Sequence, residues 1–198
     1  MCGRYEFCTD FEELRQIAQD AMRRSSNPKG DLPRSAEILP GCLAPVMIAR
    51  ENKVIGDLQT FGLLNPHKNA LIINARAETV AQKPMFARSI AAQRCVVPTA
   101  GFYEWDGAKH KYHFTLPGED AVYLAGIYDI AEDGSHFVIL TTAPNASMQP
   151  IHDRMPLILR HDQVRPWLTD PVFALQMLAA VPPLLHRTPC DGQLSLFD

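Results

Sequence analysis

The sequence contains no apolar run of about 20 residues, the length that a membrane-spanning helix needs. Its first residues also lack the hydrophobic stretch of a signal peptide. The five cysteines form no C-x-x-C pair of the kind that suggests a zinc site or a redox dithiol. We therefore expect a cytoplasmic protein with reduced thiols, no membrane segment, no metal and no organic cofactor. The cysteines are Cys2, Cys8, Cys42, Cys95 and Cys190.

A strong excess of basic residues is also missing. The chain has 19 Lys and Arg against 22 Asp and Glu, which gives a formal net charge of −3 at pH 7. This balance argues against a strongly basic nucleic-acid coat protein, although it leaves room for a local basic groove. No internal repeat or low-complexity segment divides the 198 residues, so a single domain is the simplest interpretation.

The hydrophobic pattern predicts helices at both ends of the chain and a sheet between them. Residues 9–24 are typical of a helix, because Thr9 and Glu12 are spaced as a capping box and apolar residues recur on one stripe. Residues 25–42, rich in Ser, Pro and Gly, predict an irregular surface connection. From Val46 onward short β-rich runs follow one another, and residues 164–170 and 171–181 predict two more helices. The fold class is therefore α+β.

Cys2 is chemically unlike the other cysteines. A residue as small as cysteine allows an initiator methionine to be removed, and the new first residue would carry an α-amine and a thiol on adjacent carbons. The pKa of an α-amine is about 7.7 to 8.0, so roughly a tenth of such amines are neutral at pH 7, against less than about a thousandth of lysine side chains. Cys2 would then offer two nucleophiles on one residue.

The stretch INARAET predicts one wall of a pocket. Asn74 and Arg76 alternate with Ile73 and Ala75, so on a strand the two polar side chains share one face.

Two further stretches, GFYEW and HDRMP, offer groups that can transfer protons. Glu104 stands among aromatic residues after an apolar run, and desolvation there would raise its pKa and suit it to proton transfer. The pattern leaves open an exposed glutamate at a strand end. His152 belongs to the residue type that most often shuttles protons near neutral pH, and it stands beside Arg154, a forked donor to anions, although a histidine of this kind is more often structural.

Taken in order, six stretches resemble those of the SRAP family, the abasic-site processing proteins also called SOS response-associated peptidases. They are CGRY, NARAET, KPMF, RCVVPTAGFYEW, TTAPN and IHDRMPLIL. The resemblance implies one domain over residues 1–189, with a central mixed, partly barrel-like sheet flanked by helices. It also implies a monomer that acts on abasic sites in single-stranded DNA during the DNA damage response and is nucleoid-associated when bound.

The resemblance also assigns roles to single residues. An opened abasic site is an aldehyde, with which the α-amine of Cys2 would form a Schiff base and the thiol would close a thiazolidine ring. Asn74 would hold the reacting group, and Glu104 and His152 would move protons. The DNA-binding residues would be Gly3, Arg4, Arg76 and Arg154, the arginines gripping phosphates beside the lesion.

The chain departs from the family pattern at several positions. The family commonly has a tryptophan before Gly-Leu and another before NARAET, where this chain has Phe61 and the short stretch NPHKNA. Glu37 stands where an asparagine is usual, and the usual C-terminal stretch is missing. A base-stacking contact with DNA is therefore expected to differ.

Two other functions fit the same residues. The Cys2 thiol with a histidine and a carboxylate could make a cysteine peptidase that also removes its own leader. Alternatively, the domain could bind damaged DNA without covalent chemistry.

Residues 190–198 form a C-terminal tail that carries a second signal. Its sequence resembles the short peptide by which bacterial repair proteins dock on the DNA polymerase sliding clamp, with a glutamine and a Leu-Phe pair entering the clamp groove. The alternative is a terminal strand that covers the protein's own core. The residues of the clamp-binding motif are Gln193, Leu194, Ser195, Leu196 and Phe197.

Overall fold

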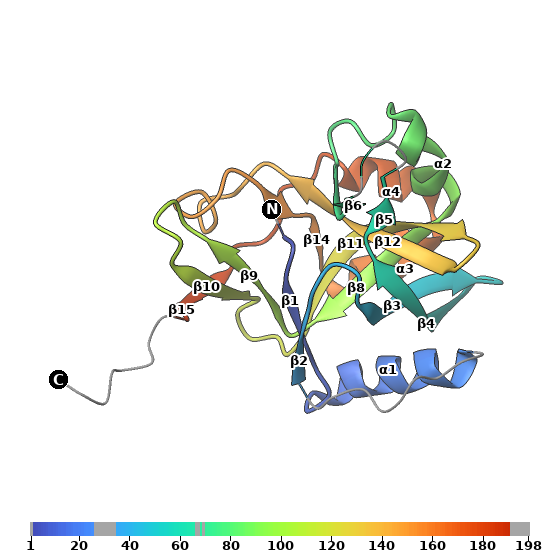
Figure 1. The fold of residues 1–198 in the computed structure, drawn as a ribbon, viewed down its shortest axis with the longest axis horizontal. Coiled ribbons are helices and arrows are strands. Elements are labelled where there is room, and N and C mark those ends of the chain that lie inside the picture. Colours follow the sequence, from blue (N-terminus) through green and yellow to red (C-terminus); the bar gives the residue numbers. More distant parts are fainter. Residues whose placement is uncertain (1, 26–34, 66–67, 69, 191–198) are drawn as a thin grey trace.

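Five strands close into a mixed barrel that holds most of the core (Figure 1). Neighbouring strands are antiparallel around the ring except for one parallel pair, β12 with β4, which closes it. The predicted partly barrel-like sheet is therefore confirmed. The barrel strands are β3 (Leu43–Arg50), β4 (Lys53–Phe61), β8 (Arg94–Thr99), β11 (Val122–Ala131) and β12 (Gly134–Thr142). In this computed structural model the described residues are 2–25, 35–65, 68 and 70–190.

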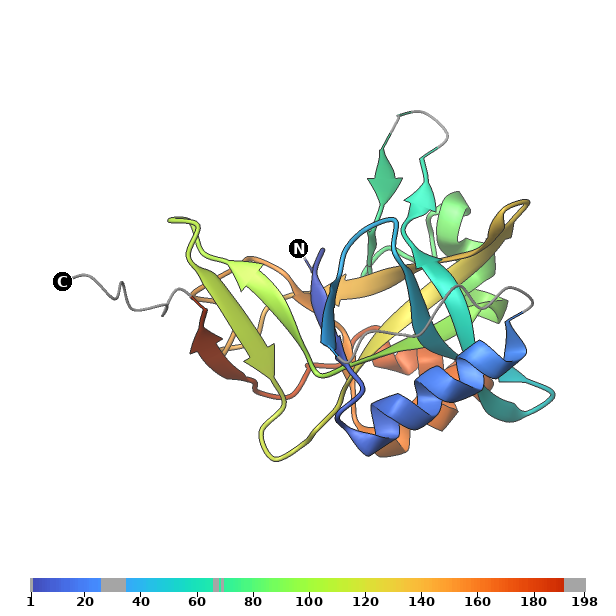
Figure 2. The same cartoon turned by 60° about the horizontal axis from the view of Figure 1, so that its bottom comes forward.

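A second, antiparallel sheet of five strands stands beside the barrel. Within this sheet, strand β1 lies between the barrel and the β9–β10 pair in both Figure 1 and Figure 2. The strands, in spatial order, are β15 (His186–Pro189), β10 (Lys111–Thr115), β9 (Gly101–Trp105), β1 (Tyr5–Cys8) and β2 (Ser35–Ile38). Because β2 falls within residues 25–42, the prediction of a wholly irregular connection there is wrong.

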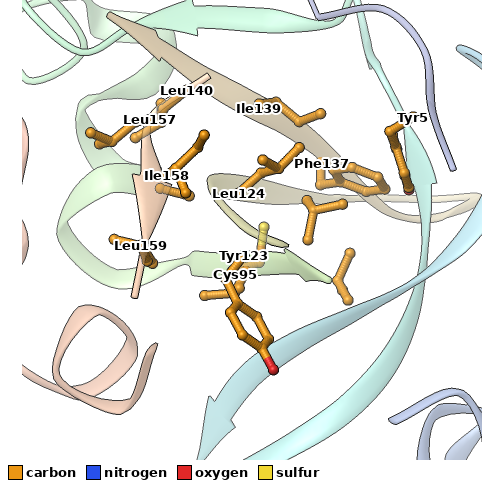
Figure 3. Packing of buried hydrophobic residues seen from close by; sticks show 14 of the residues in the cluster. Tyr5, Cys95, Tyr123, Leu124, Phe137, Ile139, Leu140, Leu157, Ile158 and Leu159 are labelled. Carbon is orange, nitrogen blue, oxygen red and sulfur yellow. The ribbon is translucent and has the colours of Figure 1, made fainter. Parts of the chain in front are cut away.

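Aromatic side chains join the two sheets. The ring of Phe61 stacks on Phe137 with centroids 5.1 Å apart, and Tyr5 from β1 meets Phe61 edge-on at 5.8 Å. Figure 3 labels Tyr5 and Phe137 among the buried hydrophobic residues of the core. All three rings are fully buried, so the start of β1 is fixed against the barrel wall.

Short strands extend the barrel toward the candidate site. β7 (Asn74–Arg76) continues along the edge of β12 where β4 leaves it, and it also runs parallel to β12. Between them the hairpin of β5 (Leu63–Leu64) and β6 (Leu71–Ile72) projects from the barrel (Figure 2). β13 (Met155–Pro156) pairs with β12, and β14 (Ile158–Leu159) pairs with β11.

Four helices cover the sheets within the described residues. α1 (Glu12–Arg24) packs so closely on β4 that a Cβ at Gly56 would lie 2.6 Å from the Ile17 carbonyl oxygen. Its N-cap is Phe11 and its first residue is Glu12, whereas a capping box of Thr9 and Glu12 needs Thr9 as the N-cap, so that prediction is wrong. The other helices are α2 (Pro84–Ala92), α3 (His161–Thr169) and α4 (Pro171–Met177).

The two helices predicted near the C-terminus are confirmed, with shifted ends. α3 begins earlier than the prediction and α4 ends earlier. They are separate because Pro171 disfavours helical geometry at Asp170, whose carboxylate instead caps α4 through the amides of Val172 and Phe173. The predicted clamp-binding motif, residues 193–197, lies outside the described residues.

Candidate functional site

Cys2 lies inside the protein, next to the strand that carries Asn74. Cys2 has no solvent-exposed surface. The Asn74 side-chain nitrogen Nδ2 donates to the Cys2 carbonyl oxygen at 3.2 Å, across 72 positions of sequence. The structure thus brings together two residues that the sequence predicted to share a site.

The position of Asn74 follows from the strand pairing. On β7, Asn74 lies opposite Ile139 of β12, and its Nδ2 also approaches the Ile139 carbonyl oxygen at 3.4 Å. Ala75 points into the core, which leaves Asn74 half-buried and Arg76 exposed, as the alternation predicted. The Asn74 oxygen Oδ1 is buried and has no hydrogen-bond partner among the described residues. A buried acceptor in this state favours an incoming N–H or O–H donor.

Glu104 faces the same interior. It lies on β9 opposite Tyr112 and is 3% exposed, so the alternative of an exposed strand-end glutamate is wrong. Burial, with a further contribution from the nearby Glu104 carboxylate, raises the pKa of the Cys2 thiol well above its usual value. The thiol is therefore protonated at neutral pH.

This protonation state predicts an order of thiol reactivity. Thiolates react with alkylating reagents, so in the native protein at pH 8 we expect iodoacetamide to label exposed Cys190 first and buried Cys2 at least about tenfold more slowly. Peptide mass mapping over time measures both rates, and unfolding in denaturant should make them similar. Preferential labelling of Cys2 in the native protein would contradict the buried, protonated thiol.

His152 is held by its own loop. Its ring nitrogen Nδ1 lies 3.0 Å from the backbone nitrogen of Arg154 and 2.9 Å from a carboxylate oxygen of Asp153. The first contact needs an unprotonated Nδ1 and the second a protonated one. Both states of the ring therefore have a partner, which suits a group that takes up and releases a proton.

Arg154 ties this loop to the strand of Asn74. It donates in a forked arrangement to both carboxylate oxygens of Glu78, each at 2.8 Å, and also to the Thr141 carbonyl oxygen at 2.6 Å. The hydrogen bonds from Arg154 lower the pKa of Glu78. Because Thr141 pairs with Arg76, these contacts place the HDRMP loop beside β7.

The predicted DNA-binding residues differ in their surroundings. Arg76 is exposed, and Gly3 is half-buried. Arg4 donates to Glu37 at 2.9 Å, while Arg154 is held by Glu78. A phosphate that binds Arg4 or Arg154 must therefore compete with a carboxylate of the protein itself.

Sequence reasoning missed the partners of these arginines. Glu37 forms ion pairs with both Arg4 and Lys111, and Glu78 forms one with Arg154. Period-two alternation in KYHFTL could have placed Lys111 on the outer face of its strand. For Glu78 no local signal exists, since its partner lies 76 positions away.

Within the described ranges, no His, Cys, Asp or Glu side chains form a group of three that could hold a metal ion. None of the helices there is both long and apolar enough to cross a membrane.

Comparison with known proteins identifies the family. The model of the family described as SOS response associated peptidase (SRAP) matches residues 1–189. The abasic site processing proteins YoaM and YoqW of Bacillus subtilis are 33% identical over 197 residues and 31% identical over 198 residues. These alignments cover 90% of this chain and 85% and 86% of the relatives. A solved Bordetella bronchiseptica protein has the same fold, with a TM-score of 0.75, 21% identity and coverage of 95% of this chain and 99% of its own. The chain therefore belongs to the SRAP family.

Proposed function

We propose that this protein processes abasic sites in single-stranded DNA by forming a covalent bond through Cys2 once residue 1 has been removed. The observation that carries the proposal is the Asn74 side chain, which holds the Cys2 carbonyl and whose buried Oδ1 has no hydrogen-bond partner in the part of the chain that the structure describes. Membership of a family whose curated relatives are named abasic site processing proteins supports the same substrate.

The chemistry begins at the α-amine, since the thiol is protonated. The neutral amine adds to the aldehyde carbon of the opened sugar, giving a carbinolamine that loses one water to form an imine. The thiol then adds across the C=N bond: its sulfur bonds to carbon, and its proton is transferred to nitrogen. The five-membered thiazolidine that results has lost one water relative to its reactants, and it no longer contains the imine that water would hydrolyse.

The neighbouring side chains have complementary tasks in these steps. Asn74 Oδ1 accepts a hydrogen bond from the reacting nitrogen and so orients it. Glu104, buried beside the thiol, takes the thiol proton as sulfur attacks and passes it on to the nitrogen of the closing ring. His152, with a partner for each protonation state, supplies and removes protons during sugar opening and loss of water.

Single-stranded DNA is the preferred form, because the aldehyde carbon must be reached outside a base stack. Arg76 is exposed, and Arg4 and Arg154 reach phosphates by exchanging their carboxylate partners. Non-covalent binding that depends on such contacts weakens as salt rises.

A cysteine peptidase is the weaker alternative. Peptidase nucleophiles act as thiolates, and their microenvironment lowers the thiol pKa. Burial does the opposite to Cys2.

The test uses the protein with Cys2 as its first residue and a single-stranded oligonucleotide that contains one abasic site. We expect a product that survives a denaturing gel and forms faster at pH 8 than at pH 6, because the α-amine loses its proton over that range. An oligonucleotide with the reduced, non-aldehyde sugar is the control and should give no product. Equal yields from both oligonucleotides, or no stable product from either, would refute the proposal.

A further inference from the structure

The outer face of the second sheet carries aromatic rings and cations. On β9, Tyr103 and Trp105 alternate with the buried Phe102 and Glu104 and therefore point away from the core. Lys111 of β10 lies opposite Trp105. Its ammonium is 3.9 Å from the centre of the Tyr103 ring, and the Arg4 guanidinium is 5.2 Å from the centre of the Trp105 ring. We call Arg4, Tyr103, Trp105 and Lys111 the outer strip.

One carboxylate neutralises both cations of the outer strip. Glu37 projects from the edge strand β2, and its oxygen Oε2 accepts from Arg4 at 2.9 Å. Its other oxygen, Oε1, accepts from the Lys111 ammonium. Burial alone would raise the pKa of Glu37, but the contacts with Lys111 and Arg4 lower it, so Glu37 is charged at neutral pH.

This arrangement limits what the strip can bind. Cations beside aromatic rings form the usual platform for single-stranded nucleic acid, where phosphates meet the charges and bases stack on the rings. Here both charges are occupied by an acid with about a third of its side chain exposed (37%), so solvent and ligands reach the pair. A phosphate that approaches Arg4 or Lys111 must displace Glu37 and is repelled by it.

We propose that Glu37 is a selectivity residue: it competes with DNA phosphates for Arg4 and Lys111 and so weakens the hold on undamaged strands. This inference rests on the proposed function for the identity of the ligand as single-stranded DNA. Weak reversible binding lets the protein leave undamaged DNA, while an abasic strand is retained by the covalent bond at Cys2. Glu37 thus weakens the reversible binding to undamaged strands, while retention of an abasic strand depends on the covalent bond.

The experiment measures reversible binding of the full chain to a fluorescent single strand without an abasic site. Replacing the acid in Glu37→Gln should raise affinity about threefold to tenfold, because two cations become available to phosphates, and should steepen the salt dependence. Glu132→Gln, which removes an exposed acid on the turn between β11 and β12, is the matched control and should change neither. Unchanged affinity for Glu37→Gln would overturn the proposal.

A second variant separates competition from a purely structural role of Glu37. If Glu37 masks Lys111, then Lys111→Gln should lower affinity more in the Glu37→Gln background than in the wild type. Equal losses in the two backgrounds would mean that Glu37 only fastens β2. The binding assays involve no covalent step, so they succeed or fail independently of the chemistry at Cys2.

Discussion

Cys2→Ala is expected to abolish the DNA adduct that survives denaturation. Alanine is also small enough to follow an initiator methionine that is removed, so the variant keeps a free α-amine and can still form the imine. It has no thiol with which to close the ring, and water returns the imine to amine and aldehyde. We expect at least a hundredfold less stable product on a denaturing gel, because the ring removes the group that hydrolyses.

Treatment with borohydride tests whether Cys2→Ala has lost only the ring-closing step. Reduction of the imine to a stable amine should restore an adduct in Cys2→Ala, which shows that the variant still binds the lesion and still forms the first bond. Cys190→Ala, which removes an exposed thiol, should retain the wild-type yield. A wild-type yield from Cys2→Ala without reductant would contradict thiazolidine formation, and loss of folding is monitored by comparing the unfolding curves.

Glu104→Gln is expected to slow formation of the stable adduct by about 10²- to 10⁴-fold, the usual contribution of a positioned proton-transfer group. The amide has nearly the same volume as the carboxylate and suits the same buried position on β9, but it cannot accept the thiol proton. The rate is measured from gel time courses with excess protein. Glu132→Gln serves as the control for removal of one negative charge and should leave the rate unchanged.

The alkylation rate of the free Cys2 thiol distinguishes this role of Glu104 from a general loss of structure in the variant. The Glu104 carboxylate helps to raise the pKa of Cys2, so Glu104→Gln should lower that pKa and speed alkylation of Cys2 at pH 8. Faster alkylation with slower capture identifies Glu104 as the proton acceptor. An unchanged capture rate would remove it from the mechanism.

The strands were predictable where the pattern is local. The β-rich runs predicted from Val46 onward include residues 94–105, 121–130 and 136–143, where the structure has β8 with β9, β11 and β12. β2 was missed because its Ser- and Pro-rich surroundings favour a loop, and its stability comes from pairing with β1. Tertiary pairing of this kind overrides local propensity.

The site was predictable as residue types, whereas its geometry depends on distant pairings. Asn74 reaches Cys2 only because β12 pairs in parallel with β4 and then with β7, a register that no short stretch encodes. The burial of Glu104 had a local signal, since it stands two positions after the apolar Phe102 on a strand and so shares that residue's face. The fork from Arg154 to Glu78 joins residues from two motifs, and no periodicity links them.

The most direct measurement of the central claim is the mass of the adducted peptide Cys2–Arg4 after nuclease and trypsin digestion. The imine and the thiazolidine have equal masses, so the adduct is first treated with borohydride and iodoacetamide. We predict a mass equal to peptide plus sugar remnant minus one water, unchanged by either reagent, because the ring has neither a C=N bond nor a free thiol. A gain of two hydrogens together with an alkylated sulfur, or attachment at any other residue, would contradict the account.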